Sequence, residues 1–554
     1  MSFDADVIIL GCGPVGAVAA NFLGMYGLRC IVLEREAGPH GQPRAFSCDD
    51  EALRIYQQIG LVEALRADMV ACERVEYTGV GGRKFAQIDV GELEFGTGYA
   101  PLHFFYQPLL EQTLRGGLRR FPRVSLRLGH ELTALRQDDE AVSVEVRVVA
   151  TGEYQQLRAR HLLACDGAHS PVRRLLEVAL VGRRYDERWL AVSGLAGEDA
   201  VRVAHTRFVC DPARPAFVGK GPAGDFRMEF MLRPDETPEE MEKPETIRRL
   251  VAPFVDPTRL EIRRAVVYRF GNAVADRWQV GRVLLLGDAA HQMPPFMGQG
   301  LVSGLRDVAN VCWKLALVVT RGVDPALLAS YEQERRPHVR AMAEISVKMG
   351  HVFLAQSPTL ARARDLLFRA LDRVPRARKF IRGFEFKPGP SVEAGLIFGG
   401  RRRRGAAAGG YFPQPRVLTP AGFRARLDEL LGPGFAVVGL DCDPRALVGE
   451  AAVWAALGAR FVRILSKQTS LRMTDECVYD AIDESGALQA WFERHGAALA
   501  VVRPDRFVYG AASVGEAAAL GRALAADLRV GEGEVGEVGG SVRVGERLPS
   551  PAFR

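Results

Sequence analysis

The first clearly patterned stretch of the chain is residues 4–34, where two apolar runs flank a glycine-rich segment. Residues 7–10 (VIIL) are rich in β-branched side chains and too short for a helix, which predicts a buried parallel strand. Apolar residues then recur with helical spacing over residues 17–25, and residues 29–33 predict a second strand that ends on Glu34. Together these elements predict a βαβ unit that binds a dinucleotide.

The glycine-rich segment GCGPVG, residues 11–16, supplies the chemistry of this unit. Gly11 permits a tight turn, Gly13 lets a pyrophosphate approach the backbone, and Gly16 lets the helix pack against the strand. Unpaired N–H groups at the start of the helix favour the pyrophosphate. Glu34 can accept hydrogen bonds from a ribose diol and would repel a 2′-phosphate, so the expected ligand is FAD or NAD rather than NADP.

A second stretch, residues 219–224 (GKGPAG), fits the same glycine spacing. The residues that follow it, 226–230, alternate between apolar and polar side chains and therefore predict a strand instead of a helix. This context predicts a hairpin turn there, and no second dinucleotide site.

The remaining pattern divides the chain into further parts. Alternating segments within residues 76–100 and 186–270 predict a second, mostly antiparallel sheet. Buried strands are predicted at residues 161–165 and 283–286, and each runs into a turn that carries an acid, Asp166 or Asp288. Past about residue 395, three apolar strands with helical runs between them predict a small α/β domain.

Two loops are candidates for cofactor contact. Residues 294–300 form a Pro- and Gly-rich loop before a predicted helix, and its exposed N–H groups can lie against a flat ring and stabilise negative charge on it. Arg44 lies in a loop that can reach a phosphate or the flavin side chain, a role that the sequence alone leaves open. Asp49 and Asp50 follow it and are predicted to cap a helix.

Composition narrows the class of protein. The 554 residues are 48% hydrophobic, and no apolar run reaches the ~18 residues of a membrane span. The N-terminus lacks a basic region before an apolar core, so a cytoplasmic protein is expected. The nine cysteines are scattered without a CxxC, which argues against a zinc or dithiol centre.

The net charge of +6 is Arg-rich, and we expect it to be spread along the chain apart from a solvated run at residues 401–404. A mild excess of this kind suits an anionic cofactor or substrate better than nucleic acid, which would need a concentrated basic stripe. No nucleic-acid partner, metal or membrane span is therefore expected.

Three motifs in a fixed order carry a resemblance to a known family. They are GCGPVG with Glu34, CDGAHSPVR at residues 165–173, and GDAAHQMPPFMGQG at residues 287–300. With them, the chain resembles the class A flavoprotein aromatic hydroxylases, the para-hydroxybenzoate hydroxylase-like FAD monooxygenases. Within that group it most resembles the 3-(3-hydroxyphenyl)propionate hydroxylases, on the segments PRAFSCDDEALR, VACERVEYTG, CDPARP, FRMEFMLRPDE and VVRPDRFV.

The resemblance implies an α/β fold with interleaved domains. A Rossmann-like FAD-binding domain is expected over residues 1–75, 100–185 and 271–345, interleaved with a mostly antiparallel substrate-binding sheet over residues 76–99 and 186–270. Residues 346–394 are expected to form a helical connection. Residues 395–554 are expected to form a thioredoxin-like α/β domain, and because it lacks CxxC a structural or oligomer-forming role is the expectation.

The resemblance also implies the residues that contact FAD. They are Gly11, Gly13, Pro14, Gly16, Glu34, Arg35, Arg44, Gln107, Asp166, Gly167, Gly287, Asp288, Pro295, Gly298, Gly300 and Leu301. The first glycines and Glu34 hold the ADP half, Asp288 binds the ribityl hydroxyls, and the loop from Pro295 to Leu301 lines the isoalloxazine ring. Val302 stands where many members have Asn, so a side-chain contact is missing at that position.

The implied reaction is the ortho-hydroxylation of a phenolic acid, best matched by 3-(3-hydroxyphenyl)propionate and 3-hydroxycinnamate, with NADH or NADPH and O2. The nicotinamide is expected to bind transiently. Tyr268 and His103 are candidates to help deprotonate the phenol, although packing or surface roles are the alternatives. Arg227 is the first candidate for the substrate carboxylate, with Arg184 and Arg214 behind it, although a salt bridge is the alternative for each.

Other functions stay open at this point. A resorcinol-like or polyketide phenol would suit the same class. A different flavin enzyme such as an epoxidase, and a non-hydroxylating flavoprotein oxidase or scaffold, are the alternatives outside it. A disulfide reductase is disfavoured because CxxC is absent, and a halogenase because its reactive-lysine motif is not found. The sequence leaves a homo-oligomer open.

Overall fold

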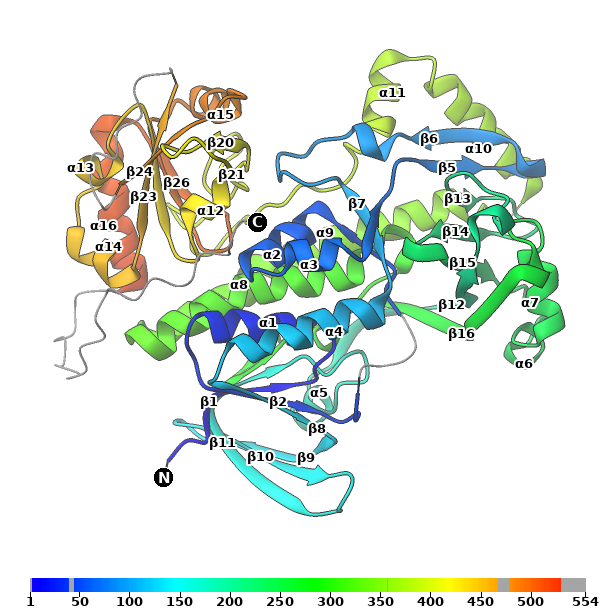
Figure 1. The fold of residues 1–554 in the computed structure, drawn as a ribbon, viewed down its shortest axis with the longest axis horizontal. Helices are drawn as coiled ribbons and strands as arrows, with labels where there is room; N and C mark the ends of the chain where they lie inside the picture. Colours follow the sequence, from blue (N-terminus) through cyan, green and yellow to red (C-terminus); the bar gives the residue numbers. More distant parts are fainter. Residues whose placement is uncertain (1, 39–43, 356, 467–477, 530–554) are drawn as a thin grey trace.

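The predicted βαβ unit opens the structure, a computed structural model that describes residues 2–38, 44–355, 357–466 and 478–529 (Figure 1). β1 (Ala5–Leu10) leads through a glycine turn into α1 (Pro14–Met25) and then into β2 (Cys30–Glu34). β1 pairs in parallel with β2 on one side and with β11 (Tyr154–Ala164) on the other. Its central residues are fully buried, as the apolar run predicted.

β1 lies within an eight-stranded sheet of order β17-β18-β11-β1-β2-β8, in which β9 and β10 extend from β11. The remaining strands are β8 (Val124–Leu128), β9 (His130–Gln137), β10 (Val142–Val148), β17 (Gln279–Val280) and β18 (Val283–Leu285). α1 packs against α4 (Gln107–Gly117) and α8 (Gln299–Arg321). Because β1, β11 and β18 are parallel, the three turns that follow them meet at one edge of the sheet.

The second sheet is mostly antiparallel, as the alternation predicted, with the order β19-β16-β12-β15-β14-β13-β5-β6. Its strands are β5 (Val75–Thr78), β6 (Lys84–Ile88), β12 (Leu180–Ala196), β13 (Thr206–Val209), β14 (Ala216–Lys220), β15 (Asp225–Met231), β16 (Leu260–Ala275) and β19 (His291–Gln292). The glycine-rich residues 219–224 lie where β14 turns into β15, so the predicted hairpin is confirmed.

Shorter elements join the two sheets. A three-stranded sheet has the order β3-β7-β4, built from β3 (Ser47–Asp49), β7 (Leu102–Phe105) and β4 (Met69–Ala71). The side chain of Asp49 caps α2 (Asp50–Gln58) by accepting a hydrogen bond from Ala52 N at 3.1 Å, which confirms the predicted cap. The other short helices are α3 (Val62–Arg66), α5 (Pro171–Leu175), α6 (Pro238–Met241) and α7 (Pro244–Val251).

Three helices follow α8 along the chain. They are α9 (Ala329–Phe353), α10 (Pro358–Leu371) and α11 (Pro375–Arg382). α10 and α11 both pack against β6, at the upper right of the view in Figure 1. Among the described residues, no helix is both long enough and apolar enough to cross a membrane.

The last part of the chain forms a seven-stranded sheet of order β21-β20-β24-β23-β22-β25-β26. Its strands are β20 (Arg416–Leu418), β21 (Arg424–Arg426), β22 (Ala436–Leu440), β23 (Arg460–Leu465), β24 (Val478–Ile482), β25 (Leu499–Val502) and β26 (Val508–Ala512). Its helices are α12 (Leu427–Leu431), α13 (Pro444–Leu447), α14 (Ala451–Leu457), α15 (Ala487–His495) and α16 (Ala517–Leu528). Residues 467–477 and 530–554 of the predicted C-terminal domain lie outside the described residues.

Buried ion pairs attach this last sheet to the rest of the chain. Arg503 donates to Glu334 of α9 at 2.6 Å, and both side chains are fully buried. Arg54 of α2 donates to Asp428 of α12 at 2.7 Å, also out of contact with water. Removing one partner of such a pair would leave an uncompensated buried charge, so these contacts hold the two parts of the chain in a defined arrangement.

Candidate active site

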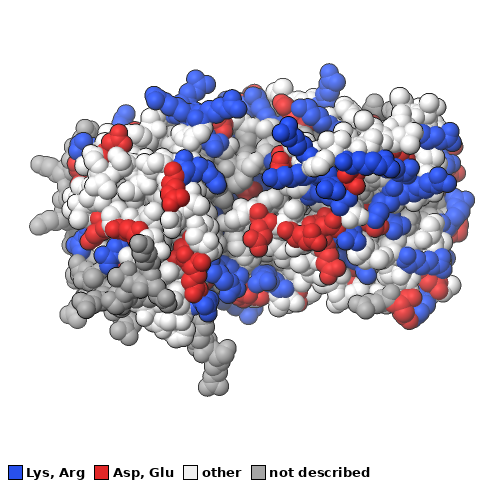
Figure 2. Space-filling view, turned by 90° about the horizontal axis from the view of Figure 1, so that it is seen from above, with Lys and Arg blue, Asp and Glu red and all other residues white. Residues whose placement is uncertain are grey.

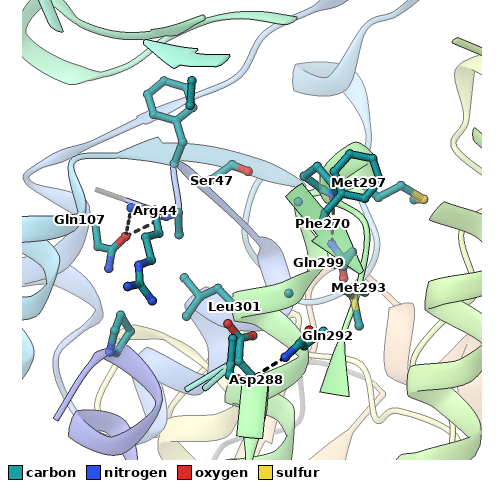
Figure 3. Close-up of a pocket in the computed structure, with 18 of the residues that line it drawn as sticks. Arg44, Ser47, Gln107, Phe270, Asp288, Gln292, Met293, Met297, Gln299 and Leu301 are labelled. Atoms are coloured by element: carbon teal, nitrogen blue, oxygen red, sulfur yellow. Dashed lines mark hydrogen bonds between the residues drawn. The ribbon is translucent and has the colours of Figure 1, made fainter. Parts of the chain in front are cut away.

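A cavity of about 1080 Å³ lies where the turns after β1, β11 and β18 face the second sheet. All of the predicted cofactor residues except Gly16 and Gly287 line it, and so do Tyr268 and Arg227. The structure therefore brings together segments that are far apart in the sequence. Figure 3 shows Arg44, Gln107, Asp288 and Leu301 around this space.

The glycines of the first turn differ in what surrounds them. Gly11 has a φ of +87°, and a Cβ there would lie 2.5 Å from the carbonyl oxygen of Cys165, so the turn requires glycine. A Cβ on Gly16 would lie 2.0 Å from the carbonyl oxygen of Gly11, which explains the close approach of α1 to the turn. A Cβ on Gly13 would meet no protein atom within 4 Å, because Gly13 faces the cavity.

The glycines of residues 287–300 also fall into two classes, those that pack closely against protein and those that face the cavity. Gly287 has a φ of +59° and lies against Val15 and Gly304, so it brings α1 and α8 together behind the cavity. Gly300, at the start of α8, lines the cavity and has no protein atom within 4 Å of the place a Cβ would take. Gly13 and Gly300 thus leave backbone exposed to a ligand at the N-termini of two helices.

Glu34 lies at the cavity, with both carboxylate oxygens held by backbone. Oε2 accepts from Cys12 N at 2.7 Å, and Oε1 accepts from Glu36 N at 3.0 Å. These bonds fix the carboxylate at the end of β2, beside the glycine turn. Its contact with a ribose stays a prediction.

Gln107 organises the loop that carries Arg44. Its Oε1 accepts from Arg44 N and Ala45 N, each at 2.7 Å, and its Nε2 donates to Glu111 at 2.7 Å (Figure 3). Arg115, one further turn along α4, donates from Nε to Cys12 O at 2.9 Å. Its buried Nη1 has no hydrogen-bond partner among the described residues.

Glu111 and Arg115 line the cavity, and the sequence reasoning missed them. Both follow Gln107 at intervals of four residues on one helix, a spacing that places the three side chains on one face. Helical spacing from the predicted Gln107 would therefore have identified both residues from the sequence.

The two predicted aspartates stand in different surroundings. Asp166 accepts from Val172 N at 3.1 Å through Oδ2, while its buried Oδ1 has no partner in the described part of the chain. Burial raises the pKa of the Asp166 carboxyl above its ordinary value. Asp288 projects into the cavity, and the surrounding protein raises the pKa of its carboxyl, although His291 and Arg44 oppose this shift.

A buried aspartate holds the Asp288 turn in place. Asp307 of α8 accepts from Gly287 N at 3.1 Å and contacts His291 Nε2 at 2.6 Å. Arg335 of α9 donates to the other oxygen of Asp307 at 3.0 Å. The turn that presents Asp288 is therefore anchored from two helices.

Charged side chains of the second sheet form the opposite wall. Ser193 on β12 pairs with Arg227 on β15 and with Arg264 on β16, so the two arginines flank it in one row. Arg227 Nε donates to Glu229 Oε1 at 2.9 Å, and the Tyr268 hydroxyl donates to Glu229 Oε2 at 2.7 Å. All of these residues except Ser193 line the cavity.

The electrostatics of this wall favour an anion. Burial, and then the nearby Glu229, raises the pKa of the Tyr268 hydroxyl well above its ordinary value. Tyr268 therefore stays protonated and donates a hydrogen bond to Glu229. Burial, and then Arg227 and Arg44, lowers the pKa of Arg264. The guanidinium groups of Arg227, Arg264 and Arg44 lie close enough to repel one another, and an anionic ligand would stabilise them.

Aromatic side chains complete the cavity. Phe208 stacks with Tyr77 and Phe353 at centroid distances of 5.3 and 4.9 Å. Phe296, in the loop after Pro295, lies 5.3 Å from Phe270 and 6.0 Å from Trp189. Flat apolar walls with a few converging polar groups suit an aromatic ring that carries polar substituents.

Two sequence candidates lie elsewhere. His103 is on β7, whose neighbouring residues Leu102 and Phe104 line the cavity, so strand alternation turns His103 away from it. Burial, and then Arg66, lowers its pKa to about 4, which keeps the ring neutral. Arg214 pairs with Glu236 at 2.5 Å outside the cavity lining, as the salt-bridge alternative expected. The side chain of Arg184 lies outside the described part of the structure.

Comparison with known proteins decides the family. Residues 4–346 match the family model described as FAD binding domain, and residues 409–527 match the one described as HcaD C-terminal domain. The chain belongs to the class A FAD-dependent monooxygenases. Its cavity fits the cofactor of that family, because Gly13 and Gly300 leave space for it and the buried Asp166 Oδ1 and Arg115 Nη1 need partners that it can supply.

Curated relatives of this monooxygenase share one named activity. It is 40% identical over 515 residues to "3-(3-hydroxy-phenyl)propionate/3-hydroxycinnamic acid hydroxylase 2" of Burkholderia vietnamiensis (strain G4 / LMG 22486), which covers 91% of this chain and 93% of the relative. It is 36% identical over 573 residues to the corresponding hydroxylase of Comamonas testosteroni, covering 94% and 96% of the two chains.

Solved structures share the fold. The flavin-dependent monooxygenase PieE, in complex with FAD and substrate, superposes with a TM-score of 0.77 at 23% identity over 95% of this monooxygenase and all of that chain. The p-nitrophenol 4-monooxygenase PnpA from Pseudomonas putida DLL-E4 has a TM-score of 0.65 at 26% identity, over 71% of this monooxygenase and all of that chain.

Proposed function

We propose that this monooxygenase ortho-hydroxylates 3-(3-hydroxyphenyl)propionate, and also 3-hydroxycinnamate, to the 2,3-dihydroxyphenyl products with NADH or NADPH and O2. The observation that carries the proposal is 40% identity over 91% of the chain to a hydroxylase of that name. The cavity supports it, because aromatic walls stand beside a wall with two arginines, which suits a ring that carries a carboxylate.

FAD is held, in this proposal, by backbone at Gly13 and Gly300 and by the side chains predicted from the sequence. The helix N-termini favour its negative charge, Arg44 and Arg115 reach the pyrophosphate region, and Asp288 takes the ribityl hydroxyls. Bound FAD supplies the chemistry of accepting a hydride and transferring one oxygen atom of O2 to the substrate. The chain supplies orientation and exclusion of water.

Tyr268 is the residue we assign to the phenol. Its proton faces Glu229 at 2.7 Å, so the lone pairs of its oxygen are available to accept a hydrogen bond from the phenol hydroxyl. As the phenol loses its proton to Tyr268, the proton of Tyr268 passes to Glu229. Loss of this proton makes the ring richer in electrons and more reactive toward the transferred oxygen. His103 takes no part in this proposal.

Arg227 and Arg264 are the residues we assign to the substrate carboxylate. Arg227 was predicted from the alternation of its strand, and Arg264 joins it through the pairing of both strands with Ser193. Arg227 donates to Glu229 at 2.9 Å, and a substrate carboxylate between the two guanidinium groups would add a charge-assisted partner to the row.

The finer organisation also belongs to the proposal. We assign the domain boundaries expected from the sequence, supported by the separate sheets. The order β23-β22-β25-β26, with β22–β23 parallel and the other pairs antiparallel, supports a thioredoxin-like C-terminal domain. Free thiols at all described cysteines and the need for a nicotinamide cofactor support a cytoplasmic location. The oligomeric state stays a prediction.

The test is anaerobic reduction of the FAD-loaded protein by NADH, with and without a panel of phenolic acids, followed by product analysis in air. We expect 3-(3-hydroxyphenyl)propionate to accelerate reduction the most and to be converted to the 2,3-dihydroxyphenyl acid. If another phenol stimulates reduction and this one does not, the substrate assignment is wrong and the class stays. NADH oxidation without any hydroxylated product would favour an oxidase.

A further inference from the structure

Residues 358–382 form one of the most positively charged segments of the chain. Residues 358–382, which span α10 and α11, contain eight Lys and Arg and two Asp, a net charge of +6 that equals the net charge of the whole chain. The expectation of an even spread is therefore wrong. The other 529 residues sum to zero, although they include a second Arg-rich stretch at residues 401–426.

The same segment exposes large apolar side chains. Leu360, Leu366 and Leu367 on α10 are 65%, 64% and 55% exposed, and Val374 and Phe380 at α11 are 50% and 48% exposed. These are five of the seventeen large apolar side chains exposed among the described residues, gathered within 21 positions. An apolar patch of this kind, surrounded by charge, marks an interaction surface.

The apolar face of α10 does not serve the core. The inward face is made by Arg364 and Phe368, which contact Phe85 at distances of 4.8 and 5.5 Å. Leu360, Leu366 and Leu367 lie outside this inward face and are exposed, and Leu366 is one helical turn from the exposed Arg362. Figure 2 looks down on the side where α11 lies in Figure 1, and Lys and Arg gather over its right half.

This face continues into the wall of the cavity. The exposed Phe380 of α11 lies 6.3 Å from Phe386, which in turn lies 4.7 Å from Phe384. Phe384 and Phe386 both line the cavity. Whatever binds α10 and α11 therefore also lies beside the active site.

We propose that α10 and α11 form a docking surface for an anionic lipid membrane, on which the enzyme binds peripherally. Leucine and phenylalanine side chains enter the interface, while the surrounding arginines pair with lipid headgroups. A second copy of the chain is disfavoured as the occupant, because a symmetric contact would place +6 against +6. Nucleic acid would use the charge and leave the leucines without a partner.

The test is cosedimentation of the full-length FAD-loaded protein with vesicles. We use phosphatidylcholine alone and phosphatidylcholine with one third phosphatidylglycerol, at 0.1 M and 0.5 M NaCl. We expect at least about fivefold more protein on the anionic vesicles at low salt, and loss of that excess at high salt. Equal binding to both vesicles, or binding to neither, overturns the proposal.

Paired substitutions separate the contribution of the exposed leucines from that of the arginines. L366S/L367S and R373E/R376E should each lower the partition onto anionic vesicles by about tenfold or more. The matched control R403E/R404E makes the same charge change in the other basic run and should leave the partition within about twofold. Bound flavin and the melting temperature confirm that each variant is folded.

Measurement of molar mass in solution tests whether a second copy of the chain, instead of a membrane, occupies this surface. If the wild type is a dimer that L366S/L367S converts to a monomer, the surface joins two copies and the membrane proposal is wrong. If R403E/R404E lowers vesicle binding as much as R373E/R376E, net charge drives binding without a defined surface, which also contradicts the proposal.

Discussion

The two walls of the active-site cavity are built by different means. On the nucleotide side, the wall is largely backbone, presented at Gly13 and Gly300 where no side chain intervenes. On the sheet side, the wall is made of charged and aromatic side chains, with Arg227, Arg264 and Tyr268 around Glu229. The first wall suits a cofactor that every member of the family shares, and the second suits the recognition of one substrate.

The difference has a structural cause. A glycine turn is specified by a few consecutive residues, because its φ angles and close contacts are local. The sheet wall depends on the register of three strands, since Ser193 must pair with both Arg227 and Arg264 to bring those arginines together. A change in one wall should therefore leave the function of the other intact.

The largest effect is expected from Gly13→Val. A Cβ at this position meets no protein atom within 4 Å, so the fold should be kept, but the side chain fills space that FAD needs. We expect FAD affinity to fall by more than about 100-fold, or ~3 kcal/mol. A fluorescence titration of the apoprotein with FAD measures it. Gly116→Val, at an exposed position with equal space, is the control, and FAD binding by G13V at wild-type affinity would contradict a backbone wall.

Tyr268→Phe tests the sheet wall at its chemical centre. Removing the hydroxyl takes away the path from the phenol to Glu229, and we expect the rate of hydroxylation to fall by about 100-fold. Single-turnover product formation measures this rate, while FAD affinity should stay unchanged. Glu229→Gln should give a similar loss, and the exposed Tyr154→Phe should give none. Full activity in Y268F would exclude Tyr268 from the proton path.

Arg264→Met and Arg227→Met test recognition of the carboxylate. Loss of a charge-assisted hydrogen bond should lower kcat/KM for 3-(3-hydroxyphenyl)propionate by roughly 10- to 100-fold. The uncharged 3-(3-hydroxyphenyl)propan-1-ol should react with R264M and with the wild type at rates within about twofold of each other. Arg214→Met, outside the cavity lining, is the matched control. Equal losses for both substrates would assign Arg264 to FAD or to the fold.

The smallest effect concerns Asp225, at the start of β15. Burial is the main cause that raises the pKa of its carboxyl to about 7, although Arg263 and Arg227 oppose the shift. Between pH 4 and pH 7 the folded state keeps a proton that the unfolded state has lost, so stability should fall as pH rises through this window. Asp225→Asn should remove this dependence and raise the melting temperature at pH 8 by ~2 °C or more. An unchanged pH profile would contradict the assignment.

The sequence predicted which turns meet at the nucleotide wall, and the reason is physical. The first turn and the Asp166 and Asp288 turns each follow a short buried strand, and parallel pairing brings the ends of those strands together. Arg115 was also within reach of the sequence, because helical spacing places it on the same face as Gln107.

The sheet wall was harder to predict. Tyr268 and Arg227 were identified from their residue types and strand alternation, but Arg264 and Glu229 depend on which strands pair and in which register. His103 was misplaced for the same reason, since the pairing of β7 with β3 and β4 decides which of its faces meets the cavity. No short motif carries that information.

The most direct test of two walls with two functions is a crystal structure with FAD and 3-(3-hydroxyphenyl)propionate bound together. We predict the pyrophosphate and the flavin ring against the backbone at Gly13 and Gly300, and the substrate carboxylate within hydrogen-bond distance of Arg264 or Arg227. A flavin ring held by the arginine row, or a substrate carboxylate bound away from it, would contradict the account.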